Sequence, residues 1–168
     1  VMPEQERRTE VARLVDRLNR EYVESRPEPG LAKAVNGRLT DYIAGITGQG
    51  VHTSSEVRDF TLARVIFPFA LGVCDILSGD VAIFRHAGVL HPHLICHEFV
   101  HRKGYWKELD AQALSYLALT SSGEPVFVQS ALSERMLRQL VVLSDADGEK
   151  FHNEVENAGL RSELKQHM

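Results

Sequence analysis

The sequence predicts a mostly helical fold with one small sheet in its middle third. Before and after that third, apolar residues recur at spacings of three and four, which is the period of an amphipathic helix. The section 57–89 is instead dense in branched and aromatic residues and is punctuated by glycines, which favours short strands. At 168 residues, of which 43% are hydrophobic, the chain fits one domain, residues 1–168, with enough apolar material for a sizeable core.

Two helices are predicted before the sheet. The first runs from Glu4 to about Ser25 and is broken by the two prolines and the glycine that follow it. The second runs from Leu31 to about Ile46. The helices predicted after the sheet span about 92–103, 107–120, 129–143 and 145–166, and the last of them has a break at Gly159.

The clearest predicted strand is Val81–Arg85. A Ser-Gly-Asp turn directly precedes it, which suggests antiparallel pairing with the segment before the turn. The apolar stretch 65–73 in that segment is expected to build part of the core and one wall of a cleft. The sheet is therefore predicted to be small and mainly antiparallel.

The charge balance argues against nucleic acid as a partner. The formal net charge is -4, and the 19 basic and 23 acidic side chains are spread along the chain without a basic stripe. Two cysteines are too few for a disulfide framework, which favours a reduced, cytoplasmic protein. No segment approaches the roughly 18 to 20 apolar residues of a membrane span. The opening Val1-Met2-Pro3 is also compatible with a piece of a longer, membrane-attached protein.

The stretch ICHEFVHRKG, residues 95–104, has the pattern of a metal site. His97 and His101 stand four positions apart, so on a helix they share one face and their imidazoles can converge on one zinc ion. Glu98 is offset by one position, which leaves its carboxylate beside the metal, where it can accept a proton from a metal-activated water. The alternative is an ordinary helix that carries two histidines.

A catalytic zinc normally takes a third protein ligand and keeps one position for water. In an extended form of this motif, a third histidine stands six residues after the second and is the third ligand. That position is Lys107 here, which is a poor ligand while protonated. Gly104 lets the chain turn sharply, and Glu108 then begins the next helix. Glu108 is the predicted third ligand and Asp110 is its rival, although an acidic residue in a first helical turn also suits the helix dipole without any metal.

The segment HEFVHRKG followed by KELDAQALSYLAL resembles the HExxH zinc metallopeptidases of the glutamate-ligand group, the gluzincins. More narrowly, it is similar to an uncharacterised family of bacterial, usually membrane-attached, zincin-like domains. The similarity covers about residues 96–119. It implies an α+β zincin fold with a small sheet beside the active-site helix, zinc on His97, His101 and Glu108, and Glu98 as the general base. It also implies that the strand near 81–85 runs beside the cleft and can hold an extended peptide.

Several other residues near the motif could contribute to the site. Gln112 stands where better-known gluzincins have an aspartate that orients a ligand histidine, so the way in which the imidazoles are held is left open. His93 lies one turn before His97, but three turns of a straight helix cannot converge on one ion, so it is expected to line the cleft or face solvent. His86 and His91 are expected to behave similarly, and either could reach the cleft. Tyr116 is expected to be a core residue.

The predicted function is that of a zinc-dependent metallopeptidase, a hydrolase in which Glu98 takes a proton from the zinc-activated water that attacks a peptide carbonyl. Its predicted cofactor is Zn²⁺, and its predicted partner is a peptide or protein substrate. The alternative is a zincin-fold binding or regulatory module with structural zinc and no turnover. That module would have a covered or filled fourth ligand position, whereas an enzyme keeps the position open.

Overall fold

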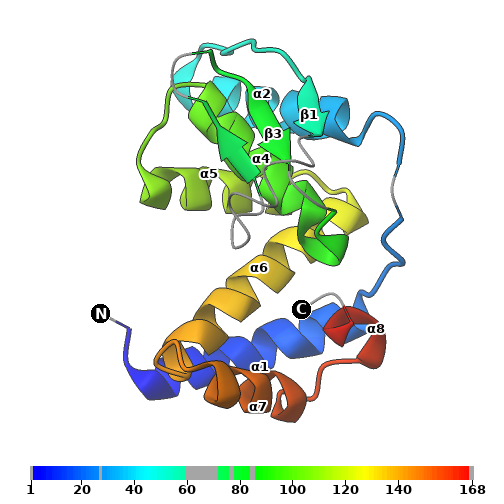
Figure 1. Ribbon diagram of the computed structural model, residues 1–168, viewed down its shortest axis with the longest axis vertical. Helices are drawn as coiled ribbons and strands as arrows, with labels where there is room; N and C mark the ends of the chain where they lie inside the picture. Colours follow the sequence, from blue (N-terminus) through cyan, green and yellow to red (C-terminus); the bar gives the residue numbers. More distant parts are fainter. Residues whose placement is uncertain (1, 27, 60–71, 76–77, 84–85, 167–168) are drawn as a thin grey trace.

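The computed structural model describes residues 2–26, 28–59, 72–75, 78–83 and 86–166, which are mostly helical and include one small sheet (Figure 1). No helix in these ranges is long and apolar enough to cross a membrane. The strands are β1 (Val57–Asp59), β2 (Gly72–Cys74) and β3 (Val81–Ile83). The helices are α1 (Glu4–Arg20), α2 (Leu31–Thr47), the 3-10 helix η1 (Gly88–Leu90), α4 (His91–Arg102), α5 (Glu108–Thr120), α6 (Pro125–Leu143), α7 (Gly148–Asn157) and α8 (Ser162–Lys165).

Helix α1 ends earlier than its apolar spacing predicts. The expected helix reached Ser25, whereas the observed one stops at Arg20. The cause is a tertiary contact, because the side-chain amide of Gln129 on α6 accepts a hydrogen bond from the Val23 N–H (2.9 Å) and donates one to the Val23 carbonyl (2.8 Å). The backbone of Val23 is therefore satisfied in an extended conformation, so continuing the helix brings no advantage.

The other helices follow the predicted pattern closely. Helix α2 begins after Gly30 (φ 87°) and ends before Gly48 (φ 74°), which confirms the element predicted from Leu31. Helix α6 begins at Pro125, four positions before the predicted start, because proline suits the first helical turn, where its missing N–H has no partner to lose. The predicted break at Gly159 (φ 74°) separates α7 from α8.

The sheet is mixed, with strand order β1-β3-β2. Strands β2 and β3 are antiparallel, with Val73 opposite Ala82, as the turn before β3 predicts. Strand β1 is parallel to β3, so the expectation of a mainly antiparallel sheet holds for only one of its two pairings. The segment 60–71, which contains most of the apolar stretch expected in the core, and residues 84–85 of the predicted strand lie outside the described residues.

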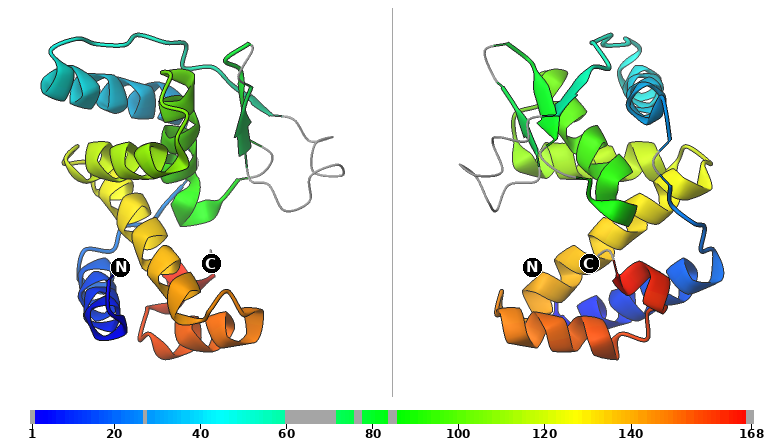
Figure 2. Two further views of the ribbon diagram at one scale, coloured as in Figure 1. Left: turned by 90° about the vertical axis from the view of Figure 1, so that its left-hand side faces the viewer. Right: turned by 45° about the vertical axis from the view of Figure 1, so that its right-hand side comes forward.

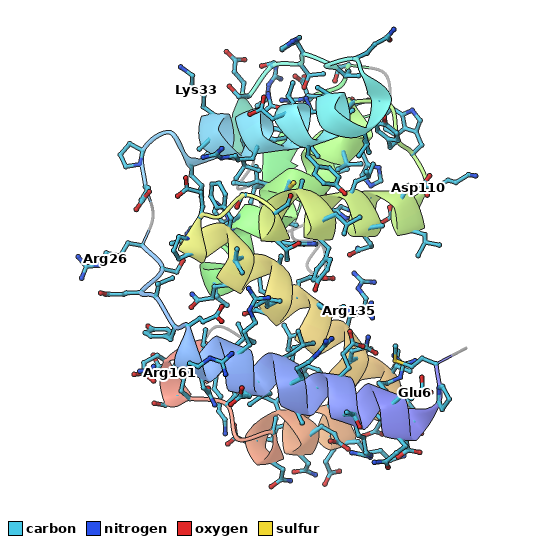
Figure 3. All side chains as sticks on the ribbon, turned by 180° about the vertical axis from the view of Figure 1, so that it is seen from behind. Glu6, Arg26, Lys33, Asp110, Arg135 and Arg161 are labelled. Carbon is cyan, nitrogen blue, oxygen red and sulfur yellow. The ribbon has the colours of Figure 1, made fainter. Side chains whose placement is uncertain are left out.

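The described core consists of two clusters joined by α6, which crosses between them diagonally (Figures 1 and 2). The first cluster packs α2, α4, α5 and the start of α6 beneath the sheet, and its fully buried members include Val35, Leu39, Ile43, Val81, Phe99, Val100 and Leu119. The second cluster lies between α1, the later turns of α6, α7 and α8, and its members include Leu14, Leu18, Leu132, Met136, Leu140 and Leu164. Arg135, labelled in Figure 3, extends from α6 and pairs with Glu10 on α1 (Nε–Oε1 2.9 Å).

Helix α4 occupies the centre of the first cluster, with α2, α5, α6 and the sheet all packed around it. Two basic side chains at its C-terminal end tie it to the surrounding loops. The guanidinium of Arg102 donates to the carbonyls of Ser54, Glu56 and Gly79 at 2.6–2.8 Å. The ammonium of Lys103, which is 7% exposed, donates to Thr40 Oγ1, the Val51 carbonyl and Thr53 Oγ1 at 2.7–3.2 Å. These bonds hold the histidine-bearing helix in a defined position against the sheet and α2.

Candidate metal centre

Helix α4 brings the two predicted histidine ligands together. His97 and His101 lie one turn apart on the face of α4 that meets α5, and their Nε2 atoms are 3.2 Å apart. Both imidazoles are largely buried, with side-chain exposures of 12% and 9%. Burial, followed by the neighbouring His101, lowers the pKa of His97, which keeps this imidazole neutral and able to donate a lone pair to a cation.

The third member of the group, the Glu108 carboxylate, reaches the histidines because the chain reverses directly after α4. Gly104 adopts φ 96°, and the Tyr105 N–H bonds back to the Val100 carbonyl (3.3 Å), which together end the helix in a Schellman-type turn. Glu108 then begins α5 with Oε2 at 3.1 Å from His97 Nε2 and Oε1 at 3.3 Å from His101 Nε2. The Glu108 side chain is 77% exposed, so the centre opens to solvent on this side.

His97, His101 and Glu108 form a group that could hold a metal ion, with ligand atoms all within 4.8 Å of one another. Two imidazoles and one carboxylate form a donor set that suits zinc and leaves a coordination position open. Asp110 lies in the same first turn of α5 (Figure 3), yet it is outside this group. Of the two carboxylates that the sequence left open, the structure therefore brings Glu108 to the histidines.

The two imidazoles are held in different ways. His101 Nδ1 lies 2.8 Å from the Tyr105 carbonyl, so this nitrogen donates its proton and Nε2 keeps its lone pair free for a cation. The indole of Trp106 is nearly parallel to the same imidazole, at 6.0 Å between ring centroids and an interplanar angle of 6°. Among the described residues, neither His97 Nδ1 nor the Oε1 atom of Gln112 has a hydrogen-bond partner, although both are buried. Gln112 therefore does not orient a ligand imidazole in this structure.

Glu98 lies beside the group and outside it. Its side chain is buried, with 7% exposure, and burial raises its pKa to about 7; His101 opposes that rise and Glu108 adds to it. A carboxyl with this pKa exchanges its proton readily near neutral pH. Glu98 is offset by one residue from His97, so it does not share the face of α4 that carries His97 and His101.

The group opens into a cleft of about 250 Å³. The described residues that line it are Val73, Cys74, His97, Glu98, His101, Trp106 and Glu108. Val73 and Cys74 belong to β2, so β2 is the strand that lines the cleft among the described residues, whereas the sequence placed the strand 81–85 there; residues 84–85 of that strand lie outside the described residues. The described part of the predicted strand, β3, lies between β1 and β2, so it has no free edge at which to hold an extended peptide.

The other three histidines that the sequence places near the motif lie outside the described ligand group. His93 was expected to line the cleft or face solvent, but it is 3% exposed, lies 3.8 Å from Glu134 on α6, and has a pKa that burial lowers to about 3. The prediction was wrong because α6 packs across that face of α4. His86 and His91 stack on each other at 4.2 Å and line a separate cavity of about 660 Å³. Tyr116 packs against both core clusters, as expected.

Sequence reasoning missed two contributors to the cleft. The Tyr105 carbonyl, which orients His101, is a backbone atom, so its role left no signal in the residue types. Trp106 could have been noticed, because it follows the predicted metal helix within the turn that leads to the predicted third ligand.

Comparison with known proteins adds no relative. No protein-family model matches the chain, and neither the curated proteins nor the solved structures contain a significant match. The structure itself shows a mostly helical chain with a small mixed sheet. It also shows a group of His97, His101 and Glu108 that could hold a metal ion.

Proposed function

We propose that this protein is a zinc-dependent metallopeptidase of the HExxH, gluzincin-like type, with a zincin-like arrangement around α4. The observation that carries the proposal is the convergence of the His97 and His101 Nε2 atoms and the Glu108 carboxylate on one point of an open cleft. A buried carboxyl with a pKa of about 7, Glu98, lines the same cleft. Metal ligands and a base of near-neutral pKa are the two components that metal-assisted hydrolysis requires.

Each residue has a distinct role in the proposed reaction. When bound, zinc supplies Lewis acidity, which lowers the pKa of water to about 7 and polarises a carbonyl oxygen. His97, His101 and Glu108 hold the ion, and the Tyr105 carbonyl keeps the His101 imidazole in the tautomer that presents Nε2. Glu98 takes the proton from the attacking water and returns it to the leaving amine, so it ends the cycle ionised as it began.

A peptide suits the cleft because the edge strand β2 borders it. Among the described strands, β2 pairs with β3, and the proposed peptide would add to the other edge of β2 through backbone hydrogen bonds. Val73 and Cys74 of that strand line the same cleft as Glu98 and the ligand group. An extended peptide along β2 would therefore run past the candidate metal centre.

The proposal is tested by measuring zinc content and peptide hydrolysis on the same preparations. Zinc-supplemented protein is expected to carry about one zinc per chain and to cleave members of a mixed peptide library, read by mass spectrometry. Glu98→Gln is expected to keep the zinc and to lose activity by about a hundredfold or more. Glu108→Ala is expected to lose most of the zinc, whereas Asp110→Ala, which removes a carboxylate from the same helical turn, keeps it.

The outcomes separate the candidate functions. Zinc retained by wild type with no hydrolysis of any peptide would favour a zincin-fold binding or regulatory module with structural zinc. Equal zinc loss in Glu108→Ala and Asp110→Ala would indicate a helix-dipole effect and remove Glu108 from the ligand set. Wild type that binds no zinc at neutral pH would overturn the proposal altogether.

A further inference from the structure

A second cavity, of about 660 Å³, lies at the first turn of α4, away from the candidate metal centre. His91 and Pro92 line it, whereas the cleft of the metal centre takes its α4 residues from His97 onward. The other described walls are the face of α2 around Gly37, the start of α6, and the segments 25–26 and 28–30 before α2. A cavity of this volume is typical of a small-molecule site.

Three helices, α2, α4 and α6, begin at this cavity (Figure 1). None of the three has an acidic residue in its first turn or a hydrogen bond from the side chain of its N-cap residue. Each of the other described α-helices, α1, α5, α7 and α8, has at least one acidic residue in its first turn. The N–H groups at a helix start carry a partial positive charge, so three such charges meet at the cavity without a first-turn carboxylate of their own.

One cation and two imidazoles add to this positive and donating character. Lys33 lines the cavity from the first turn of α2, a position at which the helix dipole disfavours a cation. The Gly88 N–H donates to His86 Nδ1 (3.1 Å) and the Ala87 N–H donates to His91 Nδ1 (3.4 Å), so in each neutral imidazole the proton lies on Nε2. Burial lowers the pKa of His91 to about 4, which keeps this ring neutral near pH 7 with Nε2–H as a hydrogen-bond donor.

The cavity also has acidic lining residues, which lie away from this region or are paired. The carboxylate of Glu124 is paired with Arg38, another lining residue (2.9 Å). Asp41 stands eight positions after Lys33 on α2, which is about 12 Å along the helix axis. Glu28 is exposed and belongs to the segment before α2. Lys33 therefore marks the cationic end of the α2 wall, and Asp41 marks its acidic end.

Gly37 leaves open space next to Lys33. It lies one turn after Lys33 inside α2, where glycine destabilises a helix relative to alanine. A Cβ atom placed on Gly37 would meet no neighbouring atom within 4 Å, although this residue lines the cavity. A larger side chain at this position would therefore occupy the cavity and not the protein core.

We infer that this cavity binds a small molecule through an oxyanion, a phosphate or carboxylate group, held where α2, α4 and α6 begin. The N–H groups of helix starts bind such groups directly, and Lys33, His86 and His91 supply a charge and two further donors. The inference is independent of the proposed function, because the two sites share no described lining residue.

The test is a ¹H–¹⁵N NMR titration of the full chain with inorganic phosphate and, separately, with succinate, at low ionic strength. Saturable shifts are expected for amides in the first turns of α2 and α6. Lys33→Met should weaken binding at least about tenfold, because it removes a charge-assisted contact. Lys150→Met, which removes the same charge from an exposed position on α7, should change the affinity less than about twofold.

A second pair of variants tests the cavity without removing a charge. Gly37→Leu should fill the space beside Lys33 and abolish the saturable shifts. Gly45→Leu makes the same substitution at an exposed position of the same helix outside the described lining, where a Cβ atom also meets no neighbour within 4 Å, and should bind as wild type does.

The outcomes either support the site or overturn it. Saturable shifts at these helix starts support it, and their appearance with phosphate, with succinate or with both identifies the group that it accepts. Shifts that fail to saturate, or that centre on His97 and Glu108, would overturn it. Equal losses of affinity in Lys33→Met and Lys150→Met, or wild-type binding by Gly37→Leu, would overturn it as well.

Discussion

Replacing Glu98 by glutamine should stabilise the metal-free protein at neutral pH while abolishing its proposed activity. The pKa of Glu98 rises from an ordinary 4.5 to about 7 on folding, chiefly through burial. The folded state therefore binds this proton more tightly than the unfolded state does. By linkage, the contribution of Glu98 is most favourable below pH 4.5, decreases as pH rises, and reaches its full cost above pH 7.

The magnitude follows from the same two values. At 1.4 kcal/mol per unit of pKa, an ionised Glu98 costs the metal-free folded state about 3 kcal/mol at pH 8. Glutamine has nearly the same shape and carries no ionisable proton. Glu98→Gln should therefore be more stable than wild type by about 3 kcal/mol at pH 8, and the two proteins should be nearly equal at pH 4.5.

The assay is urea denaturation of both proteins in the presence of a chelator, at several pH values from 4.5 to 8. The difference between the two free energies of unfolding isolates Glu98, because the other titrating groups are common to both proteins. Glu149→Gln makes the same substitution at an exposed position on α7 and serves as the control, because it removes no buried carboxyl group. A Glu98→Gln difference that stays constant across this range, or that favours wild type at pH 8, would refute the reasoning.

Two further predictions concern the neighbourhood of the centre. Trp106 is the sole tryptophan and lies 6.0 Å from the His101 ring, so Cu²⁺ at the candidate site should strongly quench the protein's tryptophan fluorescence. The saturable part of that quenching should disappear in His101→Ala but persist in His152→Ala, whose imidazole lies exposed on α7. Lys103→Met should lower the free energy of unfolding by about 2 to 4 kcal/mol, because it leaves Thr40, Thr53 and the Val51 carbonyl without their buried donor. Urea denaturation measures this loss, and a change below about 0.5 kcal/mol would show that the ammonium holds nothing in place.

The predictions from sequence succeeded where the determining interactions are local. Apolar spacing and Pro92 predict helix α4, and Gly104, a glycine suited to positive φ, predicts its end and the turn into α5. These signals all lie within a few positions of the features that they predict. The facing of His97 toward His101 follows from helical periodicity alone. The one-residue offset of Glu98 was visible for the same reason.

The tertiary structure decided what depends on contacts between distant segments. Packing of α6 across α4 buried His93, which the sequence placed in the cleft or in solvent. Hydrogen bonds between Gln129 and the backbone of Val23 accompany the early end of α1, which apolar spacing had extended to Ser25. The strand beside the cleft proved to be β2 because strand order is set by pairing between segments.

The candidate metal centre, too, has features that the sequence determines and features that only the fold decides. The sequence by itself placed His97 and His101 on one face of a helix and offered two carboxylates of one helical turn, Glu108 and Asp110, as candidates for the third ligand. Only the fold brought Glu108, and not Asp110, to the two histidines, raised the pKa of Glu98 by burial, and placed Trp106 and Val73 in the same cleft. The physical reason is that residue spacing specifies which side chains share a face of an element, whereas burial and the meeting of different elements are properties of the packed chain.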